Sequence, residues 1–262
     1  MDNILEVKNL TMDFGGLRAL DSINVKVSPK QTVALIGPNG AGKTTFFNCI
    51  TGLYTPTNGD LYLRSKTDGR RRINGLKPNH ITQLGMARTF QNIRLFANMS
   101  AIENVMIGQH CRTKTGVLGA ILRDKKTISE ETKVIKNAYD LLNEVDLPNR
   151  TNELAKNLPY GEQRRLEIAR ALATRPNLLL LDEPAAGMNP NETIELVSLI
   201  QKIQNKFQIS VLIIEHDMKM VMQLSDYIFV LDYGRLIATG TPDEIKKDPK
   251  VIQAYLGEAT DA

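Results

Sequence analysis

Residues 37–44 read Gly37-Pro38-Asn39-Gly40-Ala41-Gly42-Lys43-Thr44, an unbroken match to the pattern G-x-x-x-x-G-K-[ST]. The residues just before the motif, 32–36, are apolar and β-branched and predict a buried strand, while residues 43–50 predict a helix. Glycines let the backbone close around a phosphate and aim successive N–H groups at it, and the helix start adds its positive end. A glycine-rich turn that merely starts a helix is the alternative, and the Lys-Thr pair in register with the strand argues against it.

We therefore expect this loop to bind ATP. Lys43 should reach the β- and γ-phosphates, and the Thr44 hydroxyl should coordinate Mg²⁺. The expected nucleotide-binding residues of the loop are Gly37, Pro38, Asn39, Gly40, Ala41, Gly42, Lys43, Thr44 and Thr45.

The composition excludes several other classes of protein. The chain has 262 residues, a 42% hydrophobic fraction that suffices for a core, and a net charge of only +4 with basic and acidic residues interspersed. This pattern argues against a dedicated nucleic-acid binder. Cys49 and Cys111 lie far apart without metal-ligand spacing, so we expect a reducing compartment and neither a zinc site nor a disulfide framework. The N-terminus does not resemble a signal peptide, and no apolar run approaches the roughly 20 residues that cross a bilayer.

Hydrophobic patterning predicts an α/β fold. Residues 22–27 alternate as in a strand with one wet face, and residues 5–10 and 60–64 do so less cleanly. Buried strands are predicted at 32–36, 178–181, 210–214 and 227–231, with a helix over 130–145 and another that has Ile194, Val197, Ile200, Ile203 and Phe207 on one face. We expect a mostly parallel core sheet with an antiparallel sheet on its edge. The basic stretch 67–79 is interpreted as a solvated loop, and 116–124 as part of an insertion joining helices.

Two carboxylates, Asp182 and Glu183, follow the apolar strand 178–181. Ligands of open α/β sheets gather at the carboxyl ends of strands, where the phosphate loop also lies. Asp182 should therefore hold the Mg²⁺ hydration shell, and Glu183 should polarise the attacking water as general base. A strand-ending turn is the alternative, which the neighbouring phosphate loop disfavours. His216 ends another strand on the same sheet edge, and we expect it to contact the γ-phosphate or the water.

A second glycine turn enters a helix at residues 158–172. Because a helix N-terminus attracts anions, one chain carries two phosphate-binding elements. The two could face each other only if two molecules pack head to tail, which would enclose ATP at the joint.

Taken in order, these motifs resemble those of an ABC-type ATPase subunit over nearly the whole chain. The resemblance implies a Walker A loop at 37–44, a Walker B strand at 178–183, a signature motif at 158–163, a D-loop at 186–189, a Q-loop glutamine at Gln91 and a switch histidine at His216. It further implies that Phe14 lies against adenine, that Gln91 helps to coordinate Mg²⁺, and that Gly161 contacts the nucleotide of a partner subunit. The implied fold is one P-loop NTPase ABC cassette over 1–262. A core with an antiparallel β subdomain is implied at about 1–90 and 174–262, and a helical subdomain at about 91–173.

More narrowly, residues 90–96, the insertion at 111–129, residues 183–190 and the ending 254–258 resemble the LivG-type subunit of branched-chain amino acid importers. That resemblance implies a second ATPase subunit, in a homo- or heterodimer, two membrane permeases and a substrate-binding protein. It also places the chain peripherally at the cytoplasmic face of the membrane. The ATPase of lipopolysaccharide export shares the ending but lacks a comparably long insertion. Urea or short amides are alternative substrates for import.

The signature departs from the family's usual Leu-Ser-Gly-Gly. Pro159 stands at the serine and Tyr160 at the first glycine. Proline offers neither a hydroxyl nor a backbone N–H to a γ-phosphate, although it is well suited to begin a helix. Since a lost hydrogen bond to a charged group costs roughly 1.5–3 kcal/mol, we expect this signature to support hydrolysis less well than a standard one.

Two other functions remain as alternatives. A nucleic-acid or translation factor built on the same ATPase would usually bring a second cassette, a coiled coil or zinc modules, none of which is recognised in the sequence. A nucleotide-binding regulator without turnover is disfavoured by the presence of Glu183 and His216.

Overall fold

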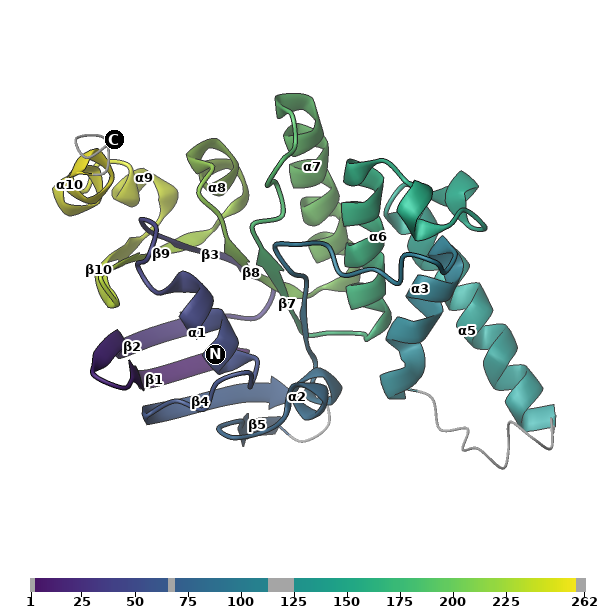
Figure 1. The fold of residues 1–262 in the computed structure, drawn as a ribbon, viewed down its shortest axis with the longest axis horizontal. Coiled ribbons are helices and arrows are strands. Elements are labelled where there is room, and N and C mark those ends of the chain that lie inside the picture. The colour runs from purple at the N-terminus through teal and green to yellow at the C-terminus, as the bar shows by residue number, and fades with distance from the viewer. Residues whose placement is uncertain (1–2, 66–68, 113–124, 258–262) are drawn as a thin grey trace. The chain divides into compact units, whose positions relative to one another are not determined.

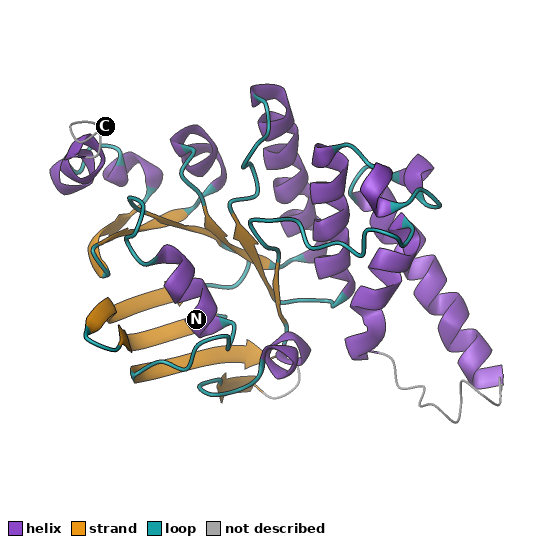
Figure 2. Ribbon diagram, viewed as in Figure 1, coloured by secondary structure: helices purple, strands orange, loops and turns teal. Residues whose placement is uncertain are grey.

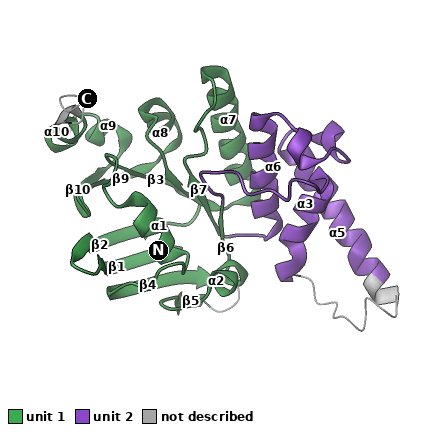
Figure 3. Cartoon of the chain, viewed as in Figure 1, with its two compact units in different colours: residues 1–88, 177–262 green, residues 89–176 purple. Residues whose placement is uncertain are grey.

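The computed structural model describes residues 3–65, 69–112 and 125–257. The chain folds into two compact units (Figure 3): unit 1 comprises Met1–Arg88 and Asn177–Ala262, and unit 2 comprises Thr89–Pro176. Among the described helices, none combines the length and apolar character needed to cross a membrane. The predicted insertion at 116–124 lies outside the described residues.

Unit 1 is built on a six-stranded, mostly parallel sheet with strand order β10-β9-β3-β8-β7-β6. Only β10 runs antiparallel to its neighbour, β9. All residues of β3, β7 and β8 are buried, which is why these strands are nearly continuous apolar runs rather than alternating ones. The predicted core strands are thus confirmed. Their bounds are β3 Thr32–Ile36, β6 Met86–Arg88, β7 Leu178–Asp182, β8 Ser210–Ile214, β9 Tyr227–Asp232 and β10 Arg235–Gly240.

Helices cover both faces of this sheet (Figures 1 and 2). α7 (Pro190–Phe207) and α8 (Met218–Leu224) lie on one face, and α1 (Lys43–Ile50) lies on the other. The predicted apolar face of α7 is correct for Val197, Ile200 and Ile203 but wrong for Ile194, which is 57% exposed. At about 100° per residue, Ile194 lies on the opposite side of the helix from the buried positions. The remaining helices of unit 1 are short: α2 Pro78–Leu84, α9 Pro242–Ile245 and α10 Pro249–Gly257.

The early strands form a separate antiparallel sheet with order β2-β1-β4-β5. The predicted antiparallel subdomain beside the parallel core sheet is thus confirmed. Within the described residues, no strand pairing joins the two sheets, because α1 lies between them: Phe46, Phe47 and Ile50 are fully buried in a core that both sheets share. The strand bounds are β1 Leu5–Phe14, β2 Leu17–Val27, β4 Asn58–Ser65 and β5 Gly69–Arg72.

β5 corrects the interpretation of 67–79 as a loop. Its residues are exposed, but they pair with β4 along the sheet edge. The Arg70 guanidinium stacks 3.9 Å from the centre of the Tyr62 ring and bonds Glu6, 2.6 Å away. Charged side chains of this kind protect an edge strand from further pairing.

Unit 2 is helical in its described part, and α3, α5 and α6 pack against one another. α3 is started by a capping box in which Ser100 and Glu103 bond each other's backbone N–H groups. α3 also approaches α6 closely, because a Cβ at Gly108 would lie 2.4 Å from the Arg170 carbonyl oxygen. The predicted helix over 130–145 is confirmed, although it begins earlier. The bounds are α3 Ala101–Gly108, η1 Gln109–Arg112, α5 Lys125–Glu144, η2 Pro148–Arg150, η3 Ala155–Asn157 and α6 Tyr160–Ala173.

Candidate functional site

The loop between β3 and α1 depends on glycine at two crowded positions. Gly37 has a φ of +150°, and a Cβ there would lie 2.0 Å from the Leu231 carbonyl oxygen. Gly42 has a φ of +104°, and a Cβ there would lie 2.8 Å from the Ala19 carbonyl oxygen. Neighbouring strands therefore press on the loop at both ends, and only glycine fits its backbone.

The Lys43 side chain folds back into this loop. Its Nζ donates to the carbonyl oxygens of Gly37 and Pro38, at 2.6 and 2.8 Å, and the residue is 8% exposed. The ammonium is thereby held in a concave backbone loop at a helix N-terminus, where anionic oxygens bind well. Thr44 is exposed at the first turn of α1, and Thr45 is half-buried.

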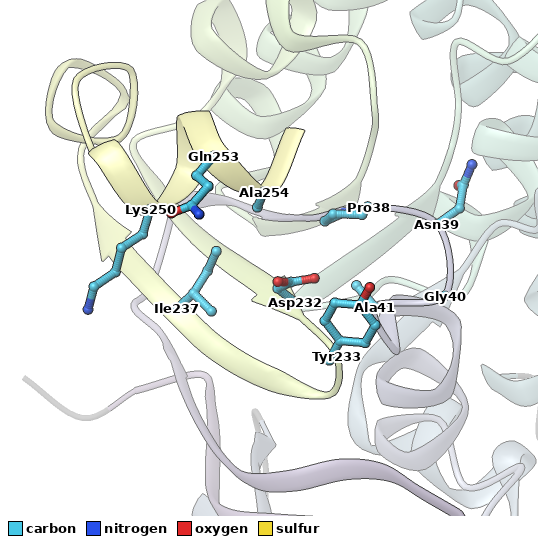
Figure 4. A pocket seen from close by; sticks show the side chains of 10 residues that line it. All are labelled: Pro38, Asn39, Gly40, Ala41, Asp232, Tyr233, Ile237, Lys250, Gln253 and Ala254. Carbon is cyan, nitrogen blue, oxygen red and sulfur yellow. The ribbon is translucent and has the colours of Figure 1, made fainter. Parts of the chain in front are cut away.

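A cavity of about 770 Å³ lies against residues 38–41 of the loop (Figure 4). Its walls come from the loop, the β9–β10 hairpin and α10. Its lining residues are Pro38, Asn39, Gly40, Ala41, Asp232, Tyr233, Ile237, Lys250, Gln253 and Ala254.

Asp182 ends β7 and is 5% exposed. Its Oδ2 forms an ion pair with Arg88 Nη2 at 2.5 Å. The other terminal nitrogen of Arg88 donates to Asn48 Oδ1 on α1 at 2.8 Å, and the guanidinium lies 5.4 Å from the centre of the Phe47 ring. Arg88 thus joins the Asp182 carboxylate to the helix that the phosphate loop starts.

Glu183 leaves the strand in a left-handed conformation, with a φ of +45°. Such conformations are uncommon for a non-glycine residue and cluster at functional sites. Its backbone N–H bonds the Ile214 carbonyl at 2.9 Å, so its position is tied to the end of β8. The Glu183 side chain is 20% exposed, and its Oε2 lies 3.9 Å from Nδ1 of His216, whose side chain is 63% exposed.

Beside this pair lies a buried carboxylate, Glu215, which is 1% exposed. Oε1 accepts the Ala185 N–H at 2.9 Å, and Oε2 accepts the N–H groups of His216 and Asp217 at 3.0 and 3.3 Å. Burial raises the pKa of the Glu215 carboxyl, and the three N–H groups act in the opposite direction.

Phe14 and Tyr54 form an edge-to-face pair in unit 1. Their ring centres lie 5.3 Å apart, and Phe14 remains 41% exposed at the end of β1. The exposed ring could stack on a planar base.

The other two expected site residues, Gln91 and Gly161, lie in unit 2. The Gln91 carbonyl accepts a hydrogen bond from Arg164 Nη2 at 2.8 Å. Arg164 is fully buried in α6 and pairs with Glu167 at 2.8 Å. Gly161 lies in the first turn of α6, two residues after the N-cap Pro159, whose carbonyl accepts the Gln163 N–H at 2.9 Å.

Sequence patterns missed two residues at the strand ends, Arg88 and Glu215. For Arg88 the sequence signal is weak: it is a basic residue at the end of a short apolar segment, and its neighbour β7, which ends in Asp182, is known only from the fold. For Glu215 the signal is an acidic residue where a wholly apolar strand ends. Neither signal identifies the partners, which become visible only in the fold.

Comparisons with known proteins agree over nearly the whole chain. Residues 20–186 match a family model described as ABC transporter, and residues 235–261 match one described as branched-chain amino acid ATP-binding cassette transporter. The chain is 50% identical over 256 residues to the high-affinity branched-chain amino acid transport ATP-binding protein BraF of Pseudomonas aeruginosa, with 98% of each protein covered. It is 46% identical over 256 residues to LivG of Escherichia coli, which carries the same description, again with 98% of each covered.

Among solved structures, the chain resembles the ADP conformation of an ATP-binding cassette of an ABC transporter. The TM-score is 0.82 at 29% identity, and the match covers 98% of this chain and 100% of the other.

Proposed function

This chain belongs to the ABC transporter family, and we propose that it hydrolyses ATP to drive the import of branched-chain amino acids. The family's ATP-binding proteins are ATPases. The observation that carries the choice of substrate is the full-length identity of 50% and 46% to two branched-chain amino acid transport proteins. The match of residues 235–261 to a family model for branched-chain amino acid transporters supports the same substrate.

The phosphate loop and Phe14 are proposed to hold the nucleotide. Lys43 is already held within the loop by the carbonyls of Gly37 and Pro38, from which it can turn to the β- and γ-phosphates. Backbone N–H groups of the loop, to which Pro38 contributes none, would bind the same phosphates. The exposed face of Phe14 would stack on adenine, with Tyr54 holding the ring from the side.

The oxygen donors of the site fit Mg²⁺. The exposed Thr44 hydroxyl and the Asp182 carboxylate are hard ligands, and we assign the Gln91 side chain as a further oxygen donor. No cluster of three His, Cys, Asp or Glu side chains that could hold a metal occurs in the described part of the chain. Mg²⁺ is usually bound through one or two carboxylates together with substrate phosphates. Bound Mg²⁺ would neutralise charge on the β- and γ-phosphates.

Glu183 and His216 are proposed to act on the attacking water and the γ-phosphate. The left-handed backbone of Glu183 and its bond to Ile214 fix the direction in which its carboxylate leaves the strand. The carboxylate would accept a proton from the water, and the His216 imidazole, 3.9 Å away, would orient the γ-phosphate.

We further propose that the working form is a dimer of ATPase subunits. In it, Gly161 at the start of α6 would approach the nucleotide of the partner subunit, with the helix dipole adding to its N–H. Two permeases would anchor the dimer at the cytoplasmic face of the membrane, and a substrate-binding protein would deliver the amino acid. No nucleic-acid partner is expected.

The test joins hydrolysis to transport. Glu183→Gln should retain the binding of a fluorescent ATP analogue and lose phosphate release, and the complex purified from detergent-solubilised membranes should contain permeases. Vesicles that hold this complex should accumulate radiolabelled leucine only with wild-type Glu183. Undiminished turnover in Glu183→Gln would remove Glu183 as the base, and ATP-dependent movement of another solute but not leucine would remove the proposed substrate.

A further inference from the structure

Glu215 collects hydrogen bonds from two loops. One loop follows β7 and contains Glu183, and the other follows β8 and contains His216. From the first loop the Ala185 N–H reaches Oε1, and from the second the N–H groups of His216 and Asp217 reach Oε2. A single side chain thereby ties together the two segments that carry the general base and the histidine.

Only a carboxylate satisfies this arrangement, because only Asp and Glu accept hydrogen bonds on both terminal oxygens without a competing donor. At 1% exposure, water is excluded from Glu215, so an N–H group that lost its acceptor would remain without a substitute. The loops are otherwise joined by the bond from the Glu183 N–H to the Ile214 carbonyl. Glu183 itself is held in a turn by the Ala186 N–H, which bonds its carbonyl at 3.2 Å.

We propose that Glu215 is a positioning residue for ATP hydrolysis, which fixes the loop of Glu183 against the loop of His216 without touching the nucleotide. The proposal rests on the proposed function. Its consequence is specific: loosening one loop from the other displaces the base from the water and leaves the phosphate loop intact. Displacement of a reacting group by about 1 Å costs roughly 100-fold in rate.

The key variant is Glu215→Gln, which has the same shape. Its amide keeps one acceptor oxygen, but its NH₂ group must then face the N–H of one of the loops. We expect kcat for phosphate release by the full-length protein to fall roughly 100-fold, with KM for ATP and the Kd of a fluorescent ATP analogue within about threefold of wild type. Glu215→Asp keeps two acceptor oxygens on a shorter stem and should recover at least about one tenth of the wild-type rate.

Asp217→Ala is the matched control in the same loop. The Asp217 carboxylate caps α8 through the N–H groups of Lys219 and Met220, so this variant loses two hydrogen bonds but leaves those of Glu215 in place. It should lower the melting temperature and leave kcat within about threefold of wild type, because a lost cap costs stability of about 1 kcal/mol.

Three results would overturn the proposal: a kcat of Glu215→Gln close to wild type, an equal loss in Asp217→Ala, or analogue binding that weakens as much as kcat falls. The last would place Glu215 in nucleotide binding. Failure of the proposed function can be told apart from failure of the Glu215 proposal. If the chain were not an ATPase, wild type would release phosphate no faster than Glu183→Gln.

Discussion

Replacing Arg88 by Met should destabilise the protein far more than removing an ordinary surface arginine. The Arg88 and Asp182 side chains are only 9% and 7% exposed, and their ion pair is 2.5 Å long. Methionine keeps an unbranched apolar stem beside Phe47, so the change removes charge and hydrogen bonds with little loss of packing. What remains is a buried carboxylate without its cation.

The structure sets the magnitude. Loss of one partner of a buried ion pair costs about 3–5 kcal/mol, because the remaining charge is uncompensated. For a chain of this size, 1 kcal/mol corresponds to roughly 2–4 °C in melting temperature. Arg88→Met should therefore melt roughly 6–20 °C below wild type in nucleotide-free buffer, as followed by differential scanning calorimetry.

The matched control is Arg72→Met. Arg72 pairs with Asp60 at 2.7 Å, but those side chains are 60% and 42% exposed, and such pairs contribute about 0–1 kcal/mol. A second comparison uses Asp182→Asn: in the Arg88→Met background it should raise the melting temperature, since it removes the unpaired charge. The reasoning is refuted if Arg88→Met melts no lower than Arg72→Met, or if adding Asp182→Asn recovers nothing.

Three further outcomes are expected. Pro159→Ser should raise the ATPase rate of the assembled complex at least about tenfold, because it restores a hydroxyl worth roughly 1.5–3 kcal/mol to a charged phosphate, and an unchanged rate of phosphate release would contradict this. Since burial raises the folded-state pKa of Glu215, its contribution to stability is fully present below the unfolded pKa, about 4.3, and is lost as pH rises through the folded value. Urea unfolding from pH 4.5 to 8 should then show the free energy of unfolding of wild type falling relative to that of Glu215→Gln as pH rises, whereas parallel curves would show that the carboxyl does not titrate differently on folding. Burial raises the pKa of the Cys49 thiol to about 12, so alkylation at pH 8 followed by mass mapping should modify Cys49 only in denaturant. Labelling of Cys49 in the native protein would contradict the burial.

The sequence predicts best where structure follows from neighbouring residues. The strand Thr32–Ile36 and the helix Lys43–Ile50 occur at the predicted residues, because apolar runs, glycines and the helix start are all local signals. The edge strand Gly69–Arg72 was not predictable in this way. Its Arg70 is held by Tyr62 and Glu6, on two other strands.

The site residues differ in the same way: some belong to local sequence patterns, and others depend on contacts between segments distant in the chain. The sequence motifs identify Lys43, Asp182 and Glu183 as candidates, since each belongs to a short pattern. Arg88 and Glu215 carry no pattern of their own. The partner of Arg88 is Asp182, and Glu215 bonds Ala185, so pairing of strands distant in the chain creates both contacts. The roles of the motif residues remain predictions that the variants above test.

The chain leaves unit 1 after Arg88 and returns at Asn177, between two strands, β6 and β7, that pair in parallel. Unit 2 is therefore, in topology, the crossover connection of a parallel strand pair, a place that a single helix usually takes. Pairing of Arg88 with Leu180 must wait for this long connection to close, and closure costs more entropy for a longer flexible loop. Early folding of unit 2, whose helices are close in sequence, would shorten the effective loop. We expect the helical unit to form before the sheet that it interrupts, so that the β6–β7 pair, which carries Arg88 and Asp182, closes only after unit 2 has folded.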